Sequence, residues 1–323
     1  MYIRTRLTEM LGISFPLIQG GLAYLARARL AAAVSNAGGL GQITAVTLGT
    51  KEALVEEIRE FRRLSEKPFA VNIALGRLDV SPFVEAVIEE EVPAVTLTAG
   101  NPEHVLSKLE GTPVKVLVLV SSPKQAKKAE TLGVDAVIAV GMEGGGHIGR
   151  DDIGSIVLLP EVVRAITIPV VASGGFMTGS QIVAALAMGA QGVEMGTRFV
   201  ATKECVAHEA YKKMLVSAGV HDTIVIERSL QRPGRALKTP YALDILEQEH
   251  RGAGFEALFP LISGAANQRA VLEGKLDEGF VWASQAVGLI EQVPSVDELF
   301  DDLKRQIGEA VHGLNGMVAL EKP

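Results

Sequence analysis

Short apolar runs, rich in β-branched residues, alternate along the chain with longer segments whose apolar residues recur at helical spacing. The runs are continuous rather than alternating, which is typical of strands that are buried on both faces. Between the runs, segment 51–64 places Leu54, Ile58 and Phe61 on one face among Glu and Arg residues, as an amphipathic helix would. The predicted strands cover residues 16–19, 40–43, 69–74, 94–98, 114–120, 136–140, 168–172 and 192–195.

The spacing of these runs leaves room for one crossover helix after each strand, which is the repeating unit of a parallel α/β fold. Segments 131–137 (TLGVDAV) and 187–193 (AMGAQGV) resemble each other, and each places a glycine where a helix would end before the next strand. Eight such units in succession, without a clear reversal of order, predict a (β/α)8 TIM barrel. An open doubly wound sheet is the alternative.

The 323 residues exceed the roughly 250 of one such barrel, and a long segment follows the last predicted strand. We therefore expect a cofactor-binding barrel domain at residues 1–220. C-terminal segments of the chain are candidates to complete its last helix. A mainly helical lid or substrate subdomain is expected at residues 221–323. Within it, residues 228–241 predict a long ordered loop, and helices are expected at 250–273 and 297–312 over the barrel mouth.

Composition and charge narrow the class of protein. Apolar residues make up 48% of the chain and charged residues 21%, which is ordinary for a globular protein with a buried core. The net charge of −7 disfavours a nucleic-acid partner. Cys205 is the single cysteine, so an internal disulfide is excluded, and no Cys/His spacing indicates a zinc site. With no apolar stretch long enough to span a bilayer and no signal-peptide pattern, we expect a cytoplasmic protein without membrane contact.

Glycine-rich segments follow the seventh and eighth predicted strands: residues 172–176 are ASGGF and residues 195–199 are MGTRF. In TIM barrels the loops after these strands recurrently bind phosphate, because bare backbone amides can surround an anion where a Cβ would block the approach. Taken alone, each of these segments would be explained as a tight turn of small residues with no ligand. Together they favour a phosphate site formed by Ser173, Gly174, Gly175, Gly196 and Thr197.

Polar amides lie at two other strand ends, Gln19 in the first strand and Asn72 in the third. Side-chain amides offer both donors and acceptors, which suits the edge of a heterocycle such as a flavin. Capping of neighbouring backbone is an equally weighted alternative for each amide.

The sixth predicted strand runs into GMEGGGHIG, residues 141–149. The consecutive glycines would let the backbone pass close to a planar cofactor and leave the imidazole of His147 in the barrel mouth. There a histidine can act as acid, base or hydrogen-bond donor to an anion. A histidine on a surface loop is the alternative.

Two absences point to a cofactor. No lysine stands at the carboxyl end of a predicted strand, since Lys115 begins the fifth, and this disfavours Schiff-base chemistry. The strand ends also lack a cluster of Asp, Glu and His for a catalytic metal. A phosphate site without nucleophile or metal indicates that a cofactor carries the chemistry.

Five ordered motifs resemble the nitronate monooxygenase (2-nitropropane dioxygenase) family, which includes FMN-dependent enoyl-acyl-carrier-protein reductases and NADH:quinone reductases. The motifs are residues 16–22 (PLIQGGL), 36–41 (NAGGLG), 143–149 (EGGGHIG), 172–176 (ASGGF) and 195–199 (MGTRF). The resemblance implies an FMN-bearing barrel with His147 as the active-site histidine. The FMN-binding set is then Gln19, Gly20, Gly21, Leu22, Asn72, Gly145, Gly146, Ser173, Gly174, Gly175, Gly196, Thr197 and Gln285.

Segment 282–288 (WASQAVG) resembles the C-terminal segment that closes over the flavin in this family, with Ser284 or Gln285 facing the site. The chain departs from the family pattern in two places. Leu22 replaces the commoner methionine, and no basic residue ends the fifth strand, where the quinone-reductase group carries a lysine.

The resemblance implies an FMN-dependent oxidoreductase, first of all a nitronate monooxygenase that oxidises alkyl nitronates with O2. An NAD(P)H:quinone reductase and an FMN-dependent enoyl-acyl-carrier-protein reductase are alternatives within the family. A cofactor-free isomerase, lyase or binder of a phosphorylated metabolite is the alternative from another class, because the glycine loops alone specify only phosphate. The expected partners are a small-molecule substrate (nitronate, quinone or enoyl thioester) and, as further candidates, NAD(P)H and a second copy of the chain.

Overall fold

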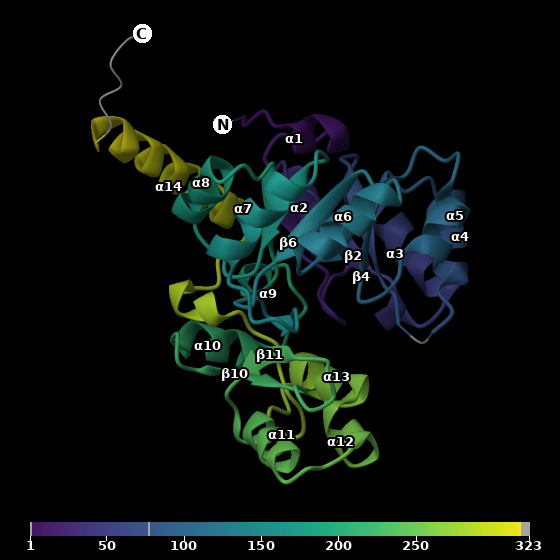
Figure 1. Cartoon of the computed structure of the whole chain (residues 1–323), viewed down its shortest axis with the longest axis vertical. Coiled ribbons are helices and arrows are strands. Elements are labelled where there is room, and N and C mark those ends of the chain that lie inside the picture. Colours follow the sequence, from purple (N-terminus) through teal and green to yellow (C-terminus); the bar gives the residue numbers. More distant parts are fainter. Residues whose placement is uncertain (1, 77, 318–323) are drawn as a thin grey trace.

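Eight parallel strands form the central sheet of the protein in a computed structural model, which describes residues 2–76 and 78–317 (Figure 1). Their hydrogen-bonded order is β1-β9-β8-β6-β5-β4-β3-β2, and a parallel bridge between Ile18 and Leu40 joins the two ends of this order. The strands are β1 (Leu17–Gln19), β2 (Gly41–Thr44), β3 (Phe69–Ala74), β4 (Ala94–Thr98), β5 (Lys115–Val120), β6 (Ala136–Val140), β8 (Val170–Ser173) and β9 (Gly192–Met195). The prediction of a (β/α)8 barrel is therefore confirmed.

Helices cover the outside of the barrel and bury one apolar face each. In α3, Thr50 caps the first turn by accepting a hydrogen bond from the Ala53 N–H, and the predicted face of Leu54, Ile58 and Phe61 is buried. The outer helices are α2 (Ala28–Asn36), α3 (Lys51–Leu64), α4 (Ser81–Glu89), α5 (Glu103–Leu109), α6 (Pro123–Thr131), α7 (Ser155–Ala165) and α8 (Gly179–Ala187). The large core between these helices and the strands holds the barrel together.

A second apolar cluster fills the inside of the barrel. Inward residues such as Ala70, Leu117 and Ile138 pack there with Leu7 and Leu11 of helix α1 (Arg6–Leu11). This helix lies at the end of the barrel opposite the lower lobe in Figure 1. Because side chains fill this end, any ligand must enter from the other, carboxyl end of the strands.

The lower lobe in Figure 1 combines a small antiparallel sheet with short helices. The sheet has the order β10 (Thr223–Ile226), β11 (Gly234–Leu237) and β7 (Gly146–His147). The helices of this lobe are α10 (Glu209–Ser217), α11 (Pro240–His250), α12 (Phe255–Ile262) and α13 (Gly264–Glu273), followed by the 3-10 turn η2 (Gln285–Leu289). The short helix α9 (Thr197–Val200) follows β9 directly and lies at the end of the barrel, above the lobe in Figure 1. The prediction of a loop over residues 228–241 is wrong at β11, because pairing with two strands distant in sequence supplies the hydrogen bonds that the local pattern does not indicate.

The C-terminal helix α14 (Val296–Met317) lies on the barrel and not in the lower lobe. It packs against α8 and α2, and the Gln306 side chain accepts a hydrogen bond of 2.7 Å from the Gly179 N–H at the start of α8. Its buried Phe300 contacts Phe15 and Phe199. This corrects the expectation that the helix at 297–312 belongs to the lid: its apolar face covers barrel surface that would otherwise be exposed.

Candidate functional site

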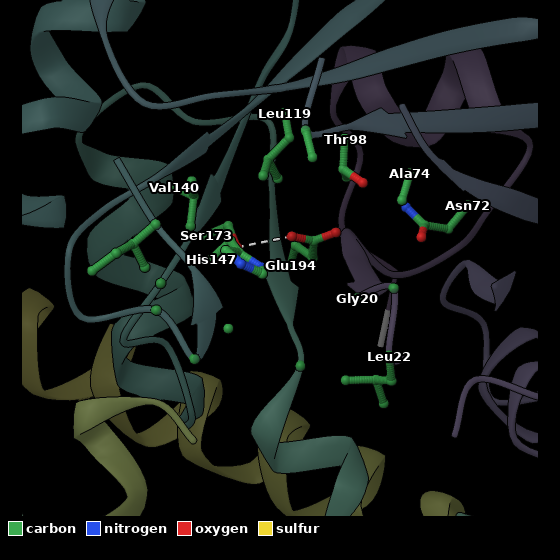
Figure 2. A pocket seen from close by; sticks show the side chains of 18 of the residues that line it. Gly20, Leu22, Asn72, Ala74, Thr98, Leu119, Val140, His147, Ser173 and Glu194 are labelled. Carbon is green, nitrogen blue, oxygen red and sulfur yellow. Dashed lines mark hydrogen bonds between the residues drawn. The ribbon is translucent and has the colours of Figure 1, made fainter. Parts of the chain in front are cut away.

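A cavity of about 650 Å³ opens at the carboxyl ends of the barrel strands, between the barrel and the lower lobe (Figure 2). Its volume lies within the roughly 300–1,000 Å³ of typical cofactor and ligand sites. The loops after β1, β6, β8 and β9 line it from the barrel side, and Asn267 and Trp282 line it from the lobe. The position agrees with the general rule for active sites of TIM barrels.

The two predicted phosphate loops meet in this cavity. Ser173, Gly174, Gly175, Gly196 and Thr197 all line it. Gly174 and Gly175 have φ angles of +86° and +85°, a conformation that favours glycine. A Cβ on Gly174 would lie 2.8 Å from the carbonyl oxygen of Gly141, so only a bare backbone fits between the loops after β6 and β8. The Ser155 hydroxyl ties these loops together by donating to the Gly174 carbonyl at 2.6 Å.

At the opposite side of the cavity, the loop after β1 packs on Asn72. A Cβ on Gly21 would lie 2.5 Å from Asn72 Cγ, and the Asn72 amide donates a hydrogen bond of 3.0 Å to the Thr96 hydroxyl. Gly20, Gly21 and Leu22 line the cavity beside it. This side therefore offers backbone, an apolar side chain and one fixed amide to a bound molecule.

Thr44 is a lining residue that the sequence argument missed. It pairs in register with Asn72, its side chain is buried, and its Oγ1 has no hydrogen-bond partner among the described residues. Buried hydroxyls normally have a hydrogen-bond partner. An unpaired hydroxyl at a cavity wall therefore indicates that a bound molecule supplies the partner. The sequence does carry a signal for Thr44: it is a polar residue directly after the second predicted strand, and Asn72 is likewise a polar residue near the end of the third.

His147 reaches the cavity on β7, an extension of the glycine-rich loop after β6. Its strand pairs with β11, which places His147 opposite Gly234. The side chain is 44% exposed, and its Nε2 lies 3.7 Å from a carboxylate oxygen of Glu227, whose side chain is only 2% exposed. The imidazole also packs 5.2 Å from the ring of Trp282. The histidine thus has an open side toward the cavity and a buried carboxylate behind it.

Similarity to known proteins agrees with this geometry. A family model described as nitronate monooxygenase matches residues 4–86 and 80–306. The chain belongs to the nitronate monooxygenase family. Proteins of this family are in general flavin-dependent, and the protein is an enzyme of the oxidoreductase class.

Three similar proteins cover almost the whole chain. FabK from Thermotoga maritima is 40% identical over 98% of this chain and 100% of that one, with a TM-score of 0.92. The (3aS,4S,5R,7aS)-5-hydroxy-7a-methyl-1-oxo-octahydro-1H-indene-4-carboxyl-CoA dehydrogenase of Rhodococcus jostii is 32% identical, with 98% of this chain and 99% of the relative covered. A probable nitronate monooxygenase of Staphylococcus saprophyticus is 30% identical, with 97% and 100% covered.

Two residues of the predicted FMN set do not line the cavity. Gln19 is fully buried, and its amide donates to the carbonyls of Gly20 at 2.8 Å and Gln42 at 3.2 Å, so it fixes strand ends instead. Gln285 begins the turn η2, and Ser284 lines the cavity in its place. The Ser284 N–H donates to the Thr197 hydroxyl at 2.9 Å, which joins the lobe to the predicted phosphate loop.

Glu194 is a further lining residue that the sequence argument missed. Its carboxylate accepts a hydrogen bond of 2.8 Å from the Ser173 hydroxyl, as Figure 2 shows. Burial raises the pKa of Glu194 to about 7. An acidic residue in the otherwise apolar strand at 192–195 was the signal that could have found it.

Neither a metal site nor a membrane span is found among the described residues. No group of three or more His, Cys, Asp or Glu side chains there could hold a metal ion. Within residues 2–76 and 78–317, no helix is long and apolar enough to cross a bilayer.

Proposed function

We propose that the protein binds FMN in this cavity and oxidises alkyl nitronates with O2. The observation that carries the proposal is the placement of His147 at a cavity whose walls include both glycine loops. Membership of the nitronate monooxygenase family supports it. NAD(P)H as an electron donor, a homodimer and a cytoplasmic location remain predictions.

The residues around the cavity suit FMN. Ser173, Gly174, Gly175, Gly196 and Thr197 would hold the phosphate, and the walls at Gly21 and Gly174 leave no room for a Cβ. At the ring end, Asn72 and the unpaired hydroxyl of Thr44 offer hydrogen bonds to a heterocycle, and Gly20, Leu22, Gly145 and Gly146 line the same space. When bound, FMN would accept electrons from the substrate and pass them to oxygen.

His147 would bind the nitronate. The anionic oxygens of a nitronate are acceptors, and an imidazole N–H directed into the cavity is a suitable donor. Glu227 lies on the other side of the ring, so positive charge on the imidazole faces a buried carboxylate. In this arrangement His147 orients the substrate and stabilises its negative charge, and the ring of Trp282 packs beside the imidazole.

The proposal is tested with the purified protein and two nitronates, propionate 3-nitronate and propyl-2-nitronate. We expect a flavin absorption spectrum and oxygen consumption on mixing. A protein that binds FMN but consumes no oxygen with either compound would contradict nitronate oxidation. A colourless protein that FMN does not reconstitute would instead support a cofactor-free enzyme or binder of a phosphorylated metabolite.

Reduction of an enoyl thioester is the second candidate. A relative named as a CoA dehydrogenase favours it, as does the similarity to FabK. The cavity also extends past Thr98 toward Pro102 and Leu119, where its lining carries few charges and could hold an acyl chain. Anaerobic mixing with NADH and NADPH decides the matter: rapid bleaching of the flavin supports this reaction or quinone reduction, and a flavin that stays oxidised excludes both.

Glu227 is predicted to support His147 without touching the substrate. Replacing it by glutamine should lower kcat roughly 10- to 100-fold, because the buried negative charge beside the imidazole is lost, while FMN content stays constant. Glu227→Asp keeps the charge and should recover part of the rate. The matched control is Asp152→Asn, which breaks an exposed ion pair with Arg228 and should leave kcat unchanged. Equal rates for Glu227→Gln and the wild type would show that the carboxylate plays no part.

A further inference from the structure

A buried acidic side chain, that of Glu194, forms part of the cavity wall. Glu194 on β9 lines the cavity and is 9% exposed. A Cβ built on Gly20 would lie 3.6 Å from its carboxyl carbon, so the carboxyl is close to the loop after β1. The reaction proposed above makes no use of this group. A carboxyl in such a place needs an explanation, because burying its charge is unfavourable.

The hydrogen bonds of Glu194 connect the two ends of the proposed FMN site. Ser173 Oγ donates to Oε2 at 2.8 Å, and Ser173 belongs to the phosphate loop. Gln42 Nε2 donates to Oε1 at 3.5 Å, and the side-chain oxygen of Gln42 accepts from the Thr96 hydroxyl. That hydroxyl in turn accepts from Asn72 at the ring end. A change in the charge of Glu194 therefore acts on both ends of the site.

No positive charge among the described residues that face the carboxylate balances it. The groups that face it are Ser173 from β8, Gln42 from β2 and the backbone of Gly20 after β1, all of them neutral. Desolvation is the main cause that raises the pKa of Glu194 to about 7, and the two hydrogen bonds oppose it. Near neutral pH the group is thus present in both forms.

The two forms leave Ser173 in different states. A hydroxyl has a single proton to donate. Beside an ionised Glu194, that proton is held by the carboxylate, and the carboxylate also repels a phosphate. Beside a neutral carboxyl, the hydroxyl is free to donate to the phosphate instead. Resting on the proposed FMN binding, we propose that Glu194 is a proton-linked positioning residue: its neutral form admits the FMN phosphate, and its ionised form weakens FMN binding.

The test is the dissociation constant of FMN, measured by quenching of flavin fluorescence with the apoprotein between pH 6 and pH 8.5. Glu194→Gln keeps the shape of the side chain and removes the charge. The ratio of the wild-type constant to that of Glu194→Gln should rise about tenfold from pH 6 to pH 8, as expected for one linked proton. Ionisation of FMN itself, and of His147, Lys128 and Tyr211 in the cavity wall, is common to both proteins and cancels in the ratio.

The outcomes separate the two proposals. A ratio that does not change with pH overturns the role of Glu194 and leaves FMN binding intact. Failure of the wild type to bind FMN at any pH overturns both. If Glu194→Gln does not fold, Ser173→Ala replaces it: loss of a donor that stabilises the carboxylate should weaken binding overall and move the pH dependence to higher pH than in the wild type. An unmoved pH dependence in Ser173→Ala would contradict the inference.

Discussion

Replacing His147 with alanine is expected to lower the rate of nitronate oxidation by about 10²- to 10⁴-fold, with FMN still bound. The side chain lines the cavity, and 44% of it is exposed. Its removal takes away the proposed donor to the substrate oxygens but none of the groups proposed to hold the FMN phosphate. The rate constant should therefore fall while the flavin spectrum and the FMN content stay as in the wild type.

The control for this variant is His221→Ala, which removes an exposed histidine of the lower lobe and should have no effect. The measurements are kcat from oxygen uptake, FMN content from the absorption spectrum, and the melting temperature. A rate within about threefold of the wild type would reduce His147 to a structural residue of β7. A protein that loses FMN as well would show that the imidazole holds the cofactor and not the substrate.

The barrel could be predicted because its signals are local. Strands β3, β4, β6 and β9 occupy the predicted residues, since each is a short, mainly apolar run. The segment Gly234–Leu237 has no such run; Arg235 lies within it, and its guanidinium is satisfied by the Met142 carbonyl at 3.0 Å. Its strand exists because β10 and β7 lie on either side of it. Pairings of this kind depend on parts of the chain that are distant in sequence.

The candidate site shows the same contrast between local sequence signals and contacts made by distant segments. The glycine loops and His147 follow directly from strand ends, and all of them line the cavity. Glu227 lies next to His147 only because the hairpin of β10 and β11 folds back on β7, and nothing near residue 227 indicates this. Ser284 and Gln285 are neighbours in sequence, but Ser284, held by hydrogen bonds to Thr197 and Glu143, is the one that lines the cavity. Local sequence therefore predicts which loops form the site but not the side chains that distant segments add.

Replacing Gly174 with alanine is expected to weaken FMN binding on the order of 100-fold, about 3 kcal/mol. Two effects act together. The φ angle of +86° is strained for any residue with a Cβ, and that Cβ would lie 2.8 Å and 3.0 Å from the backbone oxygen and nitrogen of Gly141. A backbone cannot move aside as a flexible side chain can. The loop after β8 must therefore shift away from the loop after β6, which widens the proposed phosphate site.

Gly111→Ala separates these two effects. Gly111 has a similar φ of +78°, but a Cβ there would meet no described atom within 4 Å beyond its chain neighbours, and it lies between α5 and β5 at the opposite end of the barrel. The substitution should lower the stability by only about 1 kcal/mol and leave FMN affinity unchanged. The measurements are the FMN dissociation constant and the free energy of unfolding of both apoproteins. If Gly174→Ala loses more stability than Gly111→Ala but binds FMN like the wild type, the close approach at Gly174 serves the fold alone. If only Gly174→Ala loses affinity, the narrow contact between the two loops is what shapes the phosphate site.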